Sequence, residues 1–331
     1  MGNSKLMPKT INKHLDSVYP ALAMMAGMQL EIFTAINDQR MTASEVAKIL
    51  KVQETRLRPL LYALVVGGLL AVDEGLFFNT DESAEFLVRG KPRYIGGLHS
   101  TYSDLWASTM HTADSIRTGE PKAKHDFSAM TPSELRSFVR GLDAGAAASA
   151  RRLVKEYGMK QFNTLLDAGG GSGGLAIALA GLCPNLMATV AELPNVAPIT
   201  RECIADNDVS ERVGVTECDL SASPPEGTYD AIVMRSVLQV LGDDDAKAVV
   251  SNCAQALRHG GEFFVIGRML DDSRVSPKEA VAVNVMFINV YEDGQAYTES
   301  EYRSWLQDAG LVENERVVLA GGYSIMRGVK R

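Results

Sequence analysis

The chain has 331 residues, with 33 Lys and Arg against 41 Asp and Glu, and a formal net charge of −8. This acidic balance disfavours a nucleic-acid-binding surface as the main function, because such a surface needs clustered basic side chains. Four scattered cysteines without C-x-x-C spacing indicate neither a disulfide framework nor a zinc site. The apolar stretch at residues 18–36 is interrupted by Pro20, Gln29 and Glu31, and no signal sequence is visible. We therefore expect a cytoplasmic protein that does not enter a membrane.

The N-terminal third is predicted to be mainly helical. Apolar residues recur at spacings of three and four along residues 19–36, which predicts one amphipathic helix. Thr42-x-x-Glu45 is a capping box that begins a second helix, and a third is expected at residues 54–66. Two short strands then flank a turn at residues 73–75. Helix, helix and hairpin in this order form a winged-helix pattern.

A winged helix often binds DNA, and its charge argues against that role here. Residues 41–90 contain five basic and seven acidic side chains, and five minus seven gives −2. A DNA-binding module needs a basic stripe. A dimerisation or scaffold role is therefore the favoured interpretation.

Residues 94–160 are predicted to form connecting helices. Thr131-Pro132-Ser133-Glu134 is a strong helix start, with a Thr cap and Pro at the first helical position. We expect the helix that begins there to continue through an alanine-rich run to Tyr157.

From residue 162 the pattern changes to short apolar runs that alternate with helical stretches. This alternation predicts a mostly parallel sheet covered by helices on both faces. Thr298-x-x-Glu301 is expected to cap the last helix. The predicted strands are residues 164–167, 186–192, 213–219, 229–234 and 262–266, followed by two closing strands at 315–319 and 323–329.

The strongest local motif is the glycine-rich run at residues 165–174, which follows the first of these strands and begins a helix. Glycines there allow a ligand to approach the backbone at the ligand-binding edge of an open sheet. Gly169, Gly171 and Gly174 also match G-x-G-x-x-G, so a dinucleotide site is an alternative.

Three carboxylates at the ends of consecutive strands favour a different ligand. Asp167 precedes the glycines, where it would attract an ammonium group and repel a pyrophosphate. Glu192 is placed to accept both hydroxyls of a ribose, and Asp219 to accept a hydrogen bond from an adenine amino group. An S-adenosyl ligand has all three groups and no phosphate. For each acid alone, a cap or turn role is the alternative.

On these residues the sequence resembles the S-adenosylmethionine-dependent methyltransferases of the plant O-methyltransferase type. The family usually has Asp where this chain has Glu192. The resemblance covers nearly the whole chain and is carried by Leu166-Asp167-x-Gly-Gly-Gly-x-Gly, Glu192-Leu193-Pro194-Asn195-Val196 and Cys218-Asp219-Leu220.

The resemblance implies an α/β fold, in which a Rossmann-like, doubly wound, seven-stranded methyltransferase domain follows an N-terminal helical winged-helix dimerisation domain. It implies a dimerisation domain at residues 1–100, linking helices that contribute to the substrate pocket at 101–160, and a catalytic domain at 161–331. It also implies a homodimer that acts on a small molecule and binds S-adenosylmethionine, with S-adenosylhomocysteine as the product. The expected cofactor-binding residues are Asp167, Gly169, Gly171, Glu192, Leu193, Asp219, Leu220, Arg235 and Ser236.

One departure from the family pattern affects the mechanism. Many members have His-Asp-Trp after the fourth strand, with the His as general base, whereas Gln239 occupies that position here. An amide cannot take a proton at neutral pH, so a phenol with a pKa of about 10 would lack its usual helper. His259 is interpreted as a helix C-cap. The linking region holds His99, His111 and His125, one of which could reach the site.

Two explanations of Gln239 stay open. The activity is lost or unusual, or the nucleophile has no proton to remove, as with a thioether sulfur or a neutral amine. Methyl transfer would then depend on alignment and exclusion of water, and nearby carboxylates or aromatic faces would stabilise the new cation. The candidate substrate-binding residues, each of which could equally serve in packing, are Tyr19, Tyr102, Trp106, Arg140, Asp143, Gln239, Met286 and Tyr291.

Within the family, residues 14–20 and 24–28 resemble the bacterial 4-methylthio-2-hydroxybutyrate S-methyltransferases of dimethylsulfoniopropionate synthesis. This resemblance implies S-methylation of a small thioether acid, with Arg140 near the substrate carboxylate and Arg235 near that of the cofactor. The alternatives are O- or N-methylation of an aromatic metabolite, and a catalytically silent ligand-binding or transcription-linked protein. No metal is expected, because no His/Asp cluster has ligand spacing.

Overall fold

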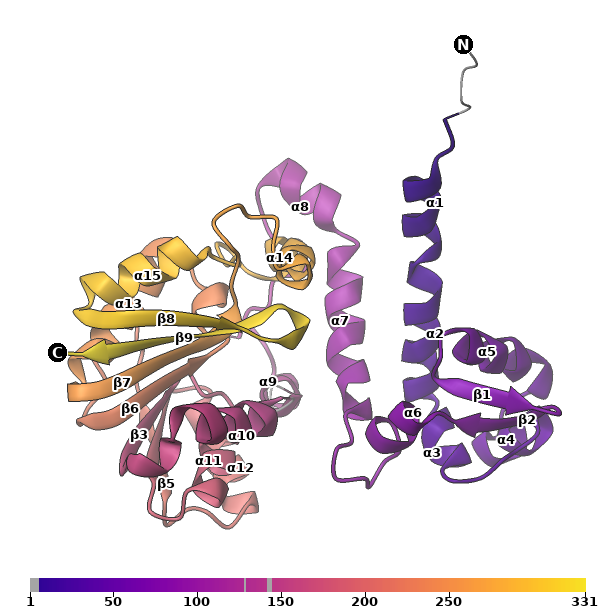
Figure 1. Cartoon of the computed structure of the whole chain (residues 1–331), viewed down its shortest axis with the longest axis horizontal. Helices are drawn as coiled ribbons and strands as arrows, with labels where there is room; N and C mark the ends of the chain where they lie inside the picture. Colours follow the sequence, from indigo (N-terminus) through magenta and orange to yellow (C-terminus); the bar gives the residue numbers. More distant parts are fainter. Residues whose placement is uncertain (1–5, 128, 142–144) are drawn as a thin grey trace. The chain divides into compact units, whose positions relative to one another are not determined.

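The computed structural model describes residues 6–127, 129–141 and 145–331 and divides into two compact units, residues 1–103 and 104–331 (Figure 1). Asp143, one of the predicted substrate-binding residues, lies outside the described residues. Within the described part of the chain, no helix has both the length and the apolar character that a membrane span requires.

The first unit contains the predicted helices and hairpin. Thr42 caps its helix as expected, since its Oγ1 accepts from the Glu45 N–H while the Glu45 carboxylate accepts from the Thr42 N–H at 2.8 Å. The helices are α1 (Lys9–Asp16), α2 (Val18–Gln29), α3 (Ile32–Ile36), α4 (Ala43–Leu50), α5 (Glu54–Val66) and α6 (Asp81–Phe86), and strands β1 (Leu70–Asp73) and β2 (Leu76–Asn79) pair antiparallel. Helix α7 (His99–Thr109) continues from this unit into the second.

The prediction of one helix over residues 19–36 was wrong. Glu31 has φ +55°, in the left-handed region, and separates α2 from α3. The break redirects the chain so that Ile32, Phe33 and Ile36 are fully buried. Spacing alone predicted a continuous helix because the apolar period runs through the break.

The second unit contains a seven-stranded sheet in the order β5-β4-β3-β6-β7-β9-β8 (Figure 1). The first five strands along this order run parallel, and β9 lies antiparallel between β7 and β8. The doubly wound fold class is therefore confirmed. The strands are β3 (Thr164–Ala168), β4 (Met187–Glu192), β5 (Val213–Glu217), β6 (Tyr229–Arg235), β7 (Leu257–Arg268), β8 (Leu311–Val318) and β9 (Tyr323–Lys330).

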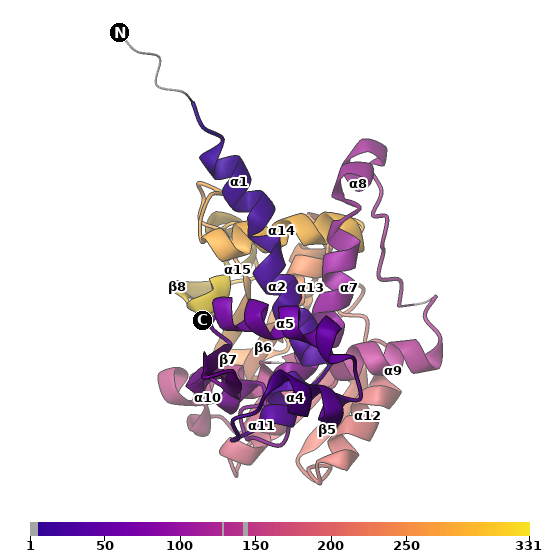
Figure 2. The same ribbon diagram turned by 90° about the vertical axis from the view of Figure 1, so that its right-hand side faces the viewer.

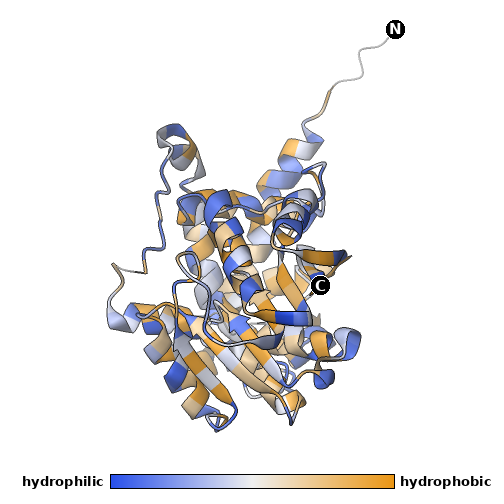
Figure 3. Ribbon diagram, turned by 90° about the vertical axis from the view of Figure 1, so that its left-hand side faces the viewer, coloured by the Kyte–Doolittle hydropathy of each residue, from blue (hydrophilic) through white to orange (hydrophobic). Residues whose placement is uncertain are grey.

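Helices cover both faces of this sheet. Alternate residues of the central strands enter two separate apolar clusters, so Leu165 and Val233 pack with α10 and α11 while Leu166 and Ile232 pack with α13 and α15. Figure 3 shows the resulting concentration of hydrophobic colour along the strands. The helices are α8 (Thr112–Thr118), α9 (Pro132–Gly141), α10 (Ala146–Tyr157), α11 (Gly174–Leu182), α12 (Ala197–Asp206), α13 (Asp243–Gln255), α14 (Lys278–Val290) and α15 (Glu299–Asp308), with a short 3₁₀ turn, η3 (Leu238–Val240).

Two further expectations are corrected here. The helix expected from residue 131 to Tyr157 is two helices, because α9 ends at Gly141 and Gly145, with φ +85°, caps the start of α10. His259 does not cap a helix. Strand β7 begins at Leu257, which pairs with Tyr229 of β6, so His259 lies within the strand.

Candidate functional site

The glycine-rich run forms a tight loop between β3 and α11, at the point where the strand order reverses. Ligands of doubly wound sheets bind at this point, beyond the carboxyl ends of the strands. Gly169, Gly171 and Gly173 have φ of +66°, +60° and +77°, which side chains other than glycine rarely adopt. A Cβ on Gly169 would lie 2.7 Å from Val237 Cγ2. Thr200 Oγ1 holds the loop from below by donating to the Gly171 carbonyl oxygen at 2.6 Å.

Asp167 lies fully buried beneath this loop. Its Oδ2 accepts from the Ala176 N–H at 3.1 Å, while no described residue hydrogen-bonds its Oδ1. Burial raises the pKa of Asp167 to about 7, although the Ala176 bond and the nearby Arg235 guanidinium oppose the shift. A buried carboxylate oxygen without a donor is costly unless a ligand supplies one. The ammonium group of an S-adenosyl ligand is such a donor, so Asp167 and the open glycine cradle fit that cofactor.

Glu192 ends β4 beside the same loop. Its Oε1 accepts from the Gly171 N–H at 2.7 Å and its Oε2 from the Leu193 N–H at 2.9 Å. Burial raises the pKa of Glu192, and these two backbone hydrogen bonds oppose the shift. A ribose-binding acid must lie next to the glycine loop, and the fold places Glu192 there.

Asp219 and Leu220 lie in the turn after β5. The strand ends at Glu217, two residues earlier than predicted, and Asp219 Oδ1 accepts from the Ser221 N–H at 3.0 Å and from the Ser221 hydroxyl at 2.6 Å. Asp219 thus stabilises its own turn, the alternative that the sequence left open. The Cys218 N–H donates to the Glu192 carbonyl oxygen at 2.9 Å, which keeps this turn next to the end of β4.

The segment after β6 brings Arg235, Ser236 and Gln239 to the same sheet edge. Ser236 has φ +61° and donates its N–H to the Ile266 carbonyl oxygen at 2.7 Å. Gln239 is buried in η3, and its Oε1 accepts from the Arg268 N–H at 2.9 Å. The amide at the family's base position therefore links η3 to the end of β7, and its oxygen is already engaged.

The remaining predicted substrate residues are dispersed. Arg140 forms a surface ion pair with Asp206 at 2.7 Å, so its guanidinium is engaged between α9 and α12. Tyr19, on α2, and Tyr102, on α7, belong to the first unit, whereas Trp106, also on α7, belongs to the second. Met286 and Tyr291 lie on α14 and at its C-terminal cap. Burial raises the pKa of Tyr291 to about 12.

Sequence reasoning did not find the partner of His125. His125 Nε2 lies 2.8 Å from Asp104 Oδ2, and the His125 ring packs edge-on against the rings of Phe138 and Tyr291. Asp104 is 21 residues earlier in the chain. No local spacing could have indicated this pair, because the intervening helix α8 brings the two residues together.

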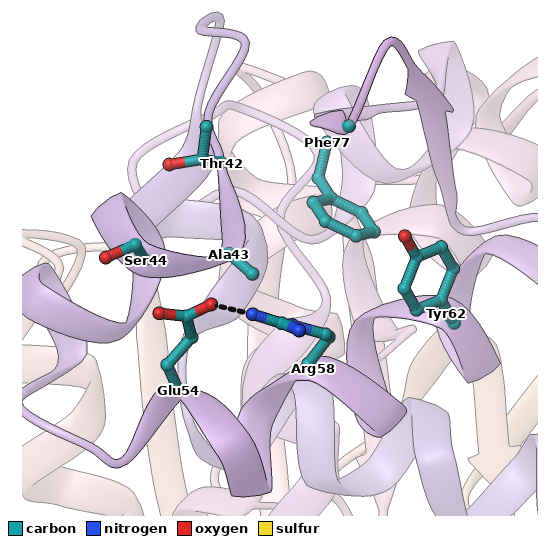
Figure 4. A pocket seen from close by; sticks show the side chains of 8 residues that line it. Thr42, Ala43, Ser44, Glu54, Arg58, Tyr62 and Phe77 are labelled. Atoms are coloured by element: carbon teal, nitrogen blue, oxygen red, sulfur yellow. Dashed lines mark hydrogen bonds and ion pairs between the residues drawn. The ribbon is translucent and has the colours of Figure 1, made fainter.

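Two pockets accompany these features. One, of about 320 Å³, lies beside Tyr291, between α8 and residues 288–295. The other, of about 240 Å³, belongs to the first unit, where Glu54 pairs with Arg58 and so neutralises its charges (Figure 4). Among the residues that the structure describes, no three His, Cys, Asp or Glu side chains are grouped closely enough to hold a metal ion.

Comparison with known proteins places this architecture in a family. Residues 116–312 match the model of the O-methyltransferase domain, and residues 12–89 match that of the O-methyltransferase dimerisation domain. The chain is 27% identical, over 98% of its length and 95% of the relative's, to the 3-hydroxy-5-methyl-1-naphthoate 3-O-methyltransferase of Streptomyces sahachiroi. It is 25% identical, over 88% of its length and 87% of the relative's, to the N,N-dimethyltransferase OxyT of Streptomyces rimosus.

A solved structure supports the same fold. Human N-acetylserotonin methyltransferase, determined in complex with S-adenosylmethionine, superposes with a TM-score of 0.85 and 21% identity, covering 100% of this chain and 99% of that one. The O-methyltransferase domain model alone spans more than half of the present chain. The chain therefore belongs to the O-methyltransferase family and is a methyltransferase that uses S-adenosylmethionine as its methyl donor.

Proposed function

We propose that this methyltransferase binds its cofactor at the carboxyl ends of β3, β4 and β6. When bound, the cofactor supplies an electrophilic methyl group on a sulfonium. Asp167 pairs with the ammonium, Arg235 with the carboxylate, and Glu192 accepts the ribose hydroxyls. Gly169 and Gly171 leave room for the ligand, and Ser236 continues this wall. Around the adenine lie Leu193, Asp219 and Leu220.

We further propose that the acceptor atom requires no proton to be removed by residue 239. The observation that supports this is the Gln239 amide, which accepts a hydrogen bond from the Arg268 N–H and has no basic atom. A thioether sulfur satisfies the requirement, and the sequence resemblance favours S-methylation of a small thioether acid such as 4-methylthio-2-hydroxybutyrate. The side chains of the site then align the sulfur with the methyl group and exclude water. Aromatic faces such as that of Tyr291 stabilise the sulfonium product.

The test is product formation. Purified protein is incubated with S-adenosylmethionine and 4-methylthio-2-hydroxybutyrate, and mass spectrometry is used to detect 4-dimethylsulfonio-2-hydroxybutyrate. We expect Gln239→His not to accelerate this reaction, because no proton is removed from sulfur. Gln239→Leu should lower the free energy of unfolding by about 1–3 kcal/mol, since the Arg268 N–H loses its acceptor. Methylation of phenols alone would contradict the thioether proposal.

A second candidate is methylation of an aromatic metabolite. The names of the two relatives favour it, one as an O-methyltransferase of a hydroxynaphthoate and the other as an N,N-dimethyltransferase. A neutral amine, like a thioether, needs no base before attack. A phenol does need one, so its methylation requires a basic group other than Gln239. A panel of thioethers, amines and phenols separates these acceptors, and calorimetric titration with S-adenosylhomocysteine checks cofactor binding independently.

A further inference from the structure

The pair His125–Asp104 combines a fixed imidazole with an unused nitrogen. The His125 side chain is 8% exposed, and its Nε2 lies 2.8 Å from Asp104 Oδ2. A carboxylate only accepts hydrogen bonds, so Nε2 carries the proton of this contact. No described residue hydrogen-bonds Nδ1, which is itself buried. In the neutral ring, Nδ1 is then an acceptor without a donor.

The backbone holds His125 firmly in this position. The His125 N–H donates to the Val290 carbonyl oxygen at 2.9 Å, and the Ala123 N–H donates to that of Asn289 at 3.0 Å, so residues 123–125 run along the end of α14. The ring is edge-on to Phe138, with centroids 5.2 Å apart, and to Tyr291, with centroids 6.2 Å apart. A ring fixed by packing on two sides and by a carboxylate is preorganised to present one nitrogen.

A short chain of contacts joins this ring to the segment that replaces the family's base. Tyr291 lines the 320 Å³ pocket. A Cβ added to Gly294 would lie 2.8 Å from Tyr291 Cβ and 2.8 Å from the Gln239 carbonyl oxygen, so Gly294 allows Tyr291 and η3 to pack closely. The unused nitrogen of His125 is therefore one aromatic ring away from the segment that carries Gln239.

A purely structural histidine would not leave this nitrogen without a partner. A buried polar atom without a hydrogen bond costs free energy that one from a ligand would recover. We propose that His125 Nδ1, with the ring oriented by Asp104, accepts a hydrogen bond from a hydroxyl group of the methyl-acceptor substrate. This inference rests on the proposed function, because it assigns a recognition element to the same substrate site. The hydroxyl belongs to an aliphatic hydroxy acid or to an aromatic ring, and the experiment distinguishes the two.

The experiment observes His125 directly by ¹⁵N NMR. The full chain is labelled at its five histidines and saturated with S-adenosylhomocysteine, so that no turnover occurs. The His125 resonances are assigned by their loss in His125→Phe, which keeps a ring between Phe138 and Tyr291. The probes are 4-methylthio-2-hydroxybutyrate against 4-methylthiobutyrate, and 3-hydroxy-1-naphthoate against 1-naphthoate.

We expect an unprotonated Nδ1 whose resonance shifts with one hydroxylated probe and not with its deoxy counterpart. In steady-state assays with S-adenosylmethionine, His125→Phe should raise the KM of that hydroxylated probe by about 10- to 100-fold and leave the KM of the counterpart unchanged. His125→Asn, which retains an acceptor near the Nδ1 position, should recover part of the loss. His111→Phe, at an exposed histidine of the same region, is the matched control and should change neither constant.

The inference is overturned if Nδ1 carries the proton, if a deoxy counterpart shifts the resonance equally, or if none of the four probes shifts it. Failure of the proposed function has a different signature. In that case no probe is methylated with S-adenosylmethionine, while the resonance measured with S-adenosylhomocysteine still reports whether the hydroxyl is bound.

Discussion

At the scale of single residues, Asp167 combines a cost to the ligand-free fold with a proposed gain on cofactor binding. Its carboxyl group is fully buried, and one oxygen has no hydrogen-bond donor among the described residues. Burial raises its pKa from 3.8 to about 7. Because the folded-state pKa lies above the unfolded value, the protein loses stability from this group as the pH rises from about 4 to about 7. Functional sites often carry such a cost.

The first prediction concerns Asp167→Asn. The amide has no charge to bury, so the variant should gain thermal stability relative to the parent, and the gain should be larger at pH 8 than at pH 5. Affinity for S-adenosylmethionine should fall at pH 8, because the ammonium loses its counter-charge. Thermal denaturation without ligand and calorimetric titration measure the two effects.

Asp230→Asn is the matched control, since Asp230 is also a buried acid of the sheet. Burial acts to raise the pKa of Asp230, but hydrogen bonds from Asn163 and Thr164 and the Arg258 charge leave it below its usual value. Asp230 therefore contributes stability that is present near neutral pH and lost on acidification, so this variant should be destabilised at pH 8. An Asp167→Asn variant less stable than the parent at pH 8 would contradict our account of that site.

At the scale of elements, the β3–α11 loop depends on backbone conformations that only glycine adopts easily. Gly169→Ala should lower the free energy of unfolding by about 1–3 kcal/mol, because its φ of +66° is strained for alanine. The added methyl would also meet Val237 at 2.7 Å. Chemical denaturation measures the loss, and cofactor affinity should fall with it.

Gly181→Ala is the control for this loop. Gly181 lies in α11, is exposed, and has nothing within 4 Å of an added Cβ. The substitution should therefore stabilise the protein by about 0.5–1 kcal/mol through helix propensity. Equal effects of the two substitutions would show that the conformation of the loop does not matter.

At the scale of the whole molecule, α1 and α2 carry apolar side chains that the rest of the first unit does not cover. The two helices follow one another almost in line (Figures 1 and 2). Ile11, Leu15, Val18 and Leu22 recur at spacings of three and four and are 47–65% exposed. The match to the dimerisation domain begins at residue 12, so this stripe lies largely within it. We propose that a second copy of the chain covers the stripe.

The double substitution Leu15→Asp and Leu22→Asp should therefore convert a dimer into a monomer, because buried carboxylates would oppose association. Sedimentation velocity measures the mass. Val66→Asp is the control, since Val66 is an exposed apolar residue at the end of α5 and lies outside the stripe. A double variant that sediments as the parent does would remove α1 and α2 from the interface.

Local patterns predicted much of this molecule. The capping boxes at Thr42 and Thr298 and the seven strands are encoded by neighbouring residues, and each is present in the structure. The glycine run likewise predicted the turn after β3, because positive φ is a property of single residues. The boundaries were weaker where one residue in the left-handed region, such as Glu31 or Gly145, ends or begins a helix inside a continuous period.

By itself, the sequence determined the fold class, the glycine loop and the absence of a basic residue at position 239. Each of these depends on residue types within a few positions of one another. Only the tertiary structure decided that Gln239 binds the Arg268 N–H, that Arg140 pairs with Asp206, and that Asp104 orients His125. These contacts join residues 21 to 66 positions apart. The side chain that fills such a contact is selected by how the elements pack, and neither spacing nor composition encodes that packing.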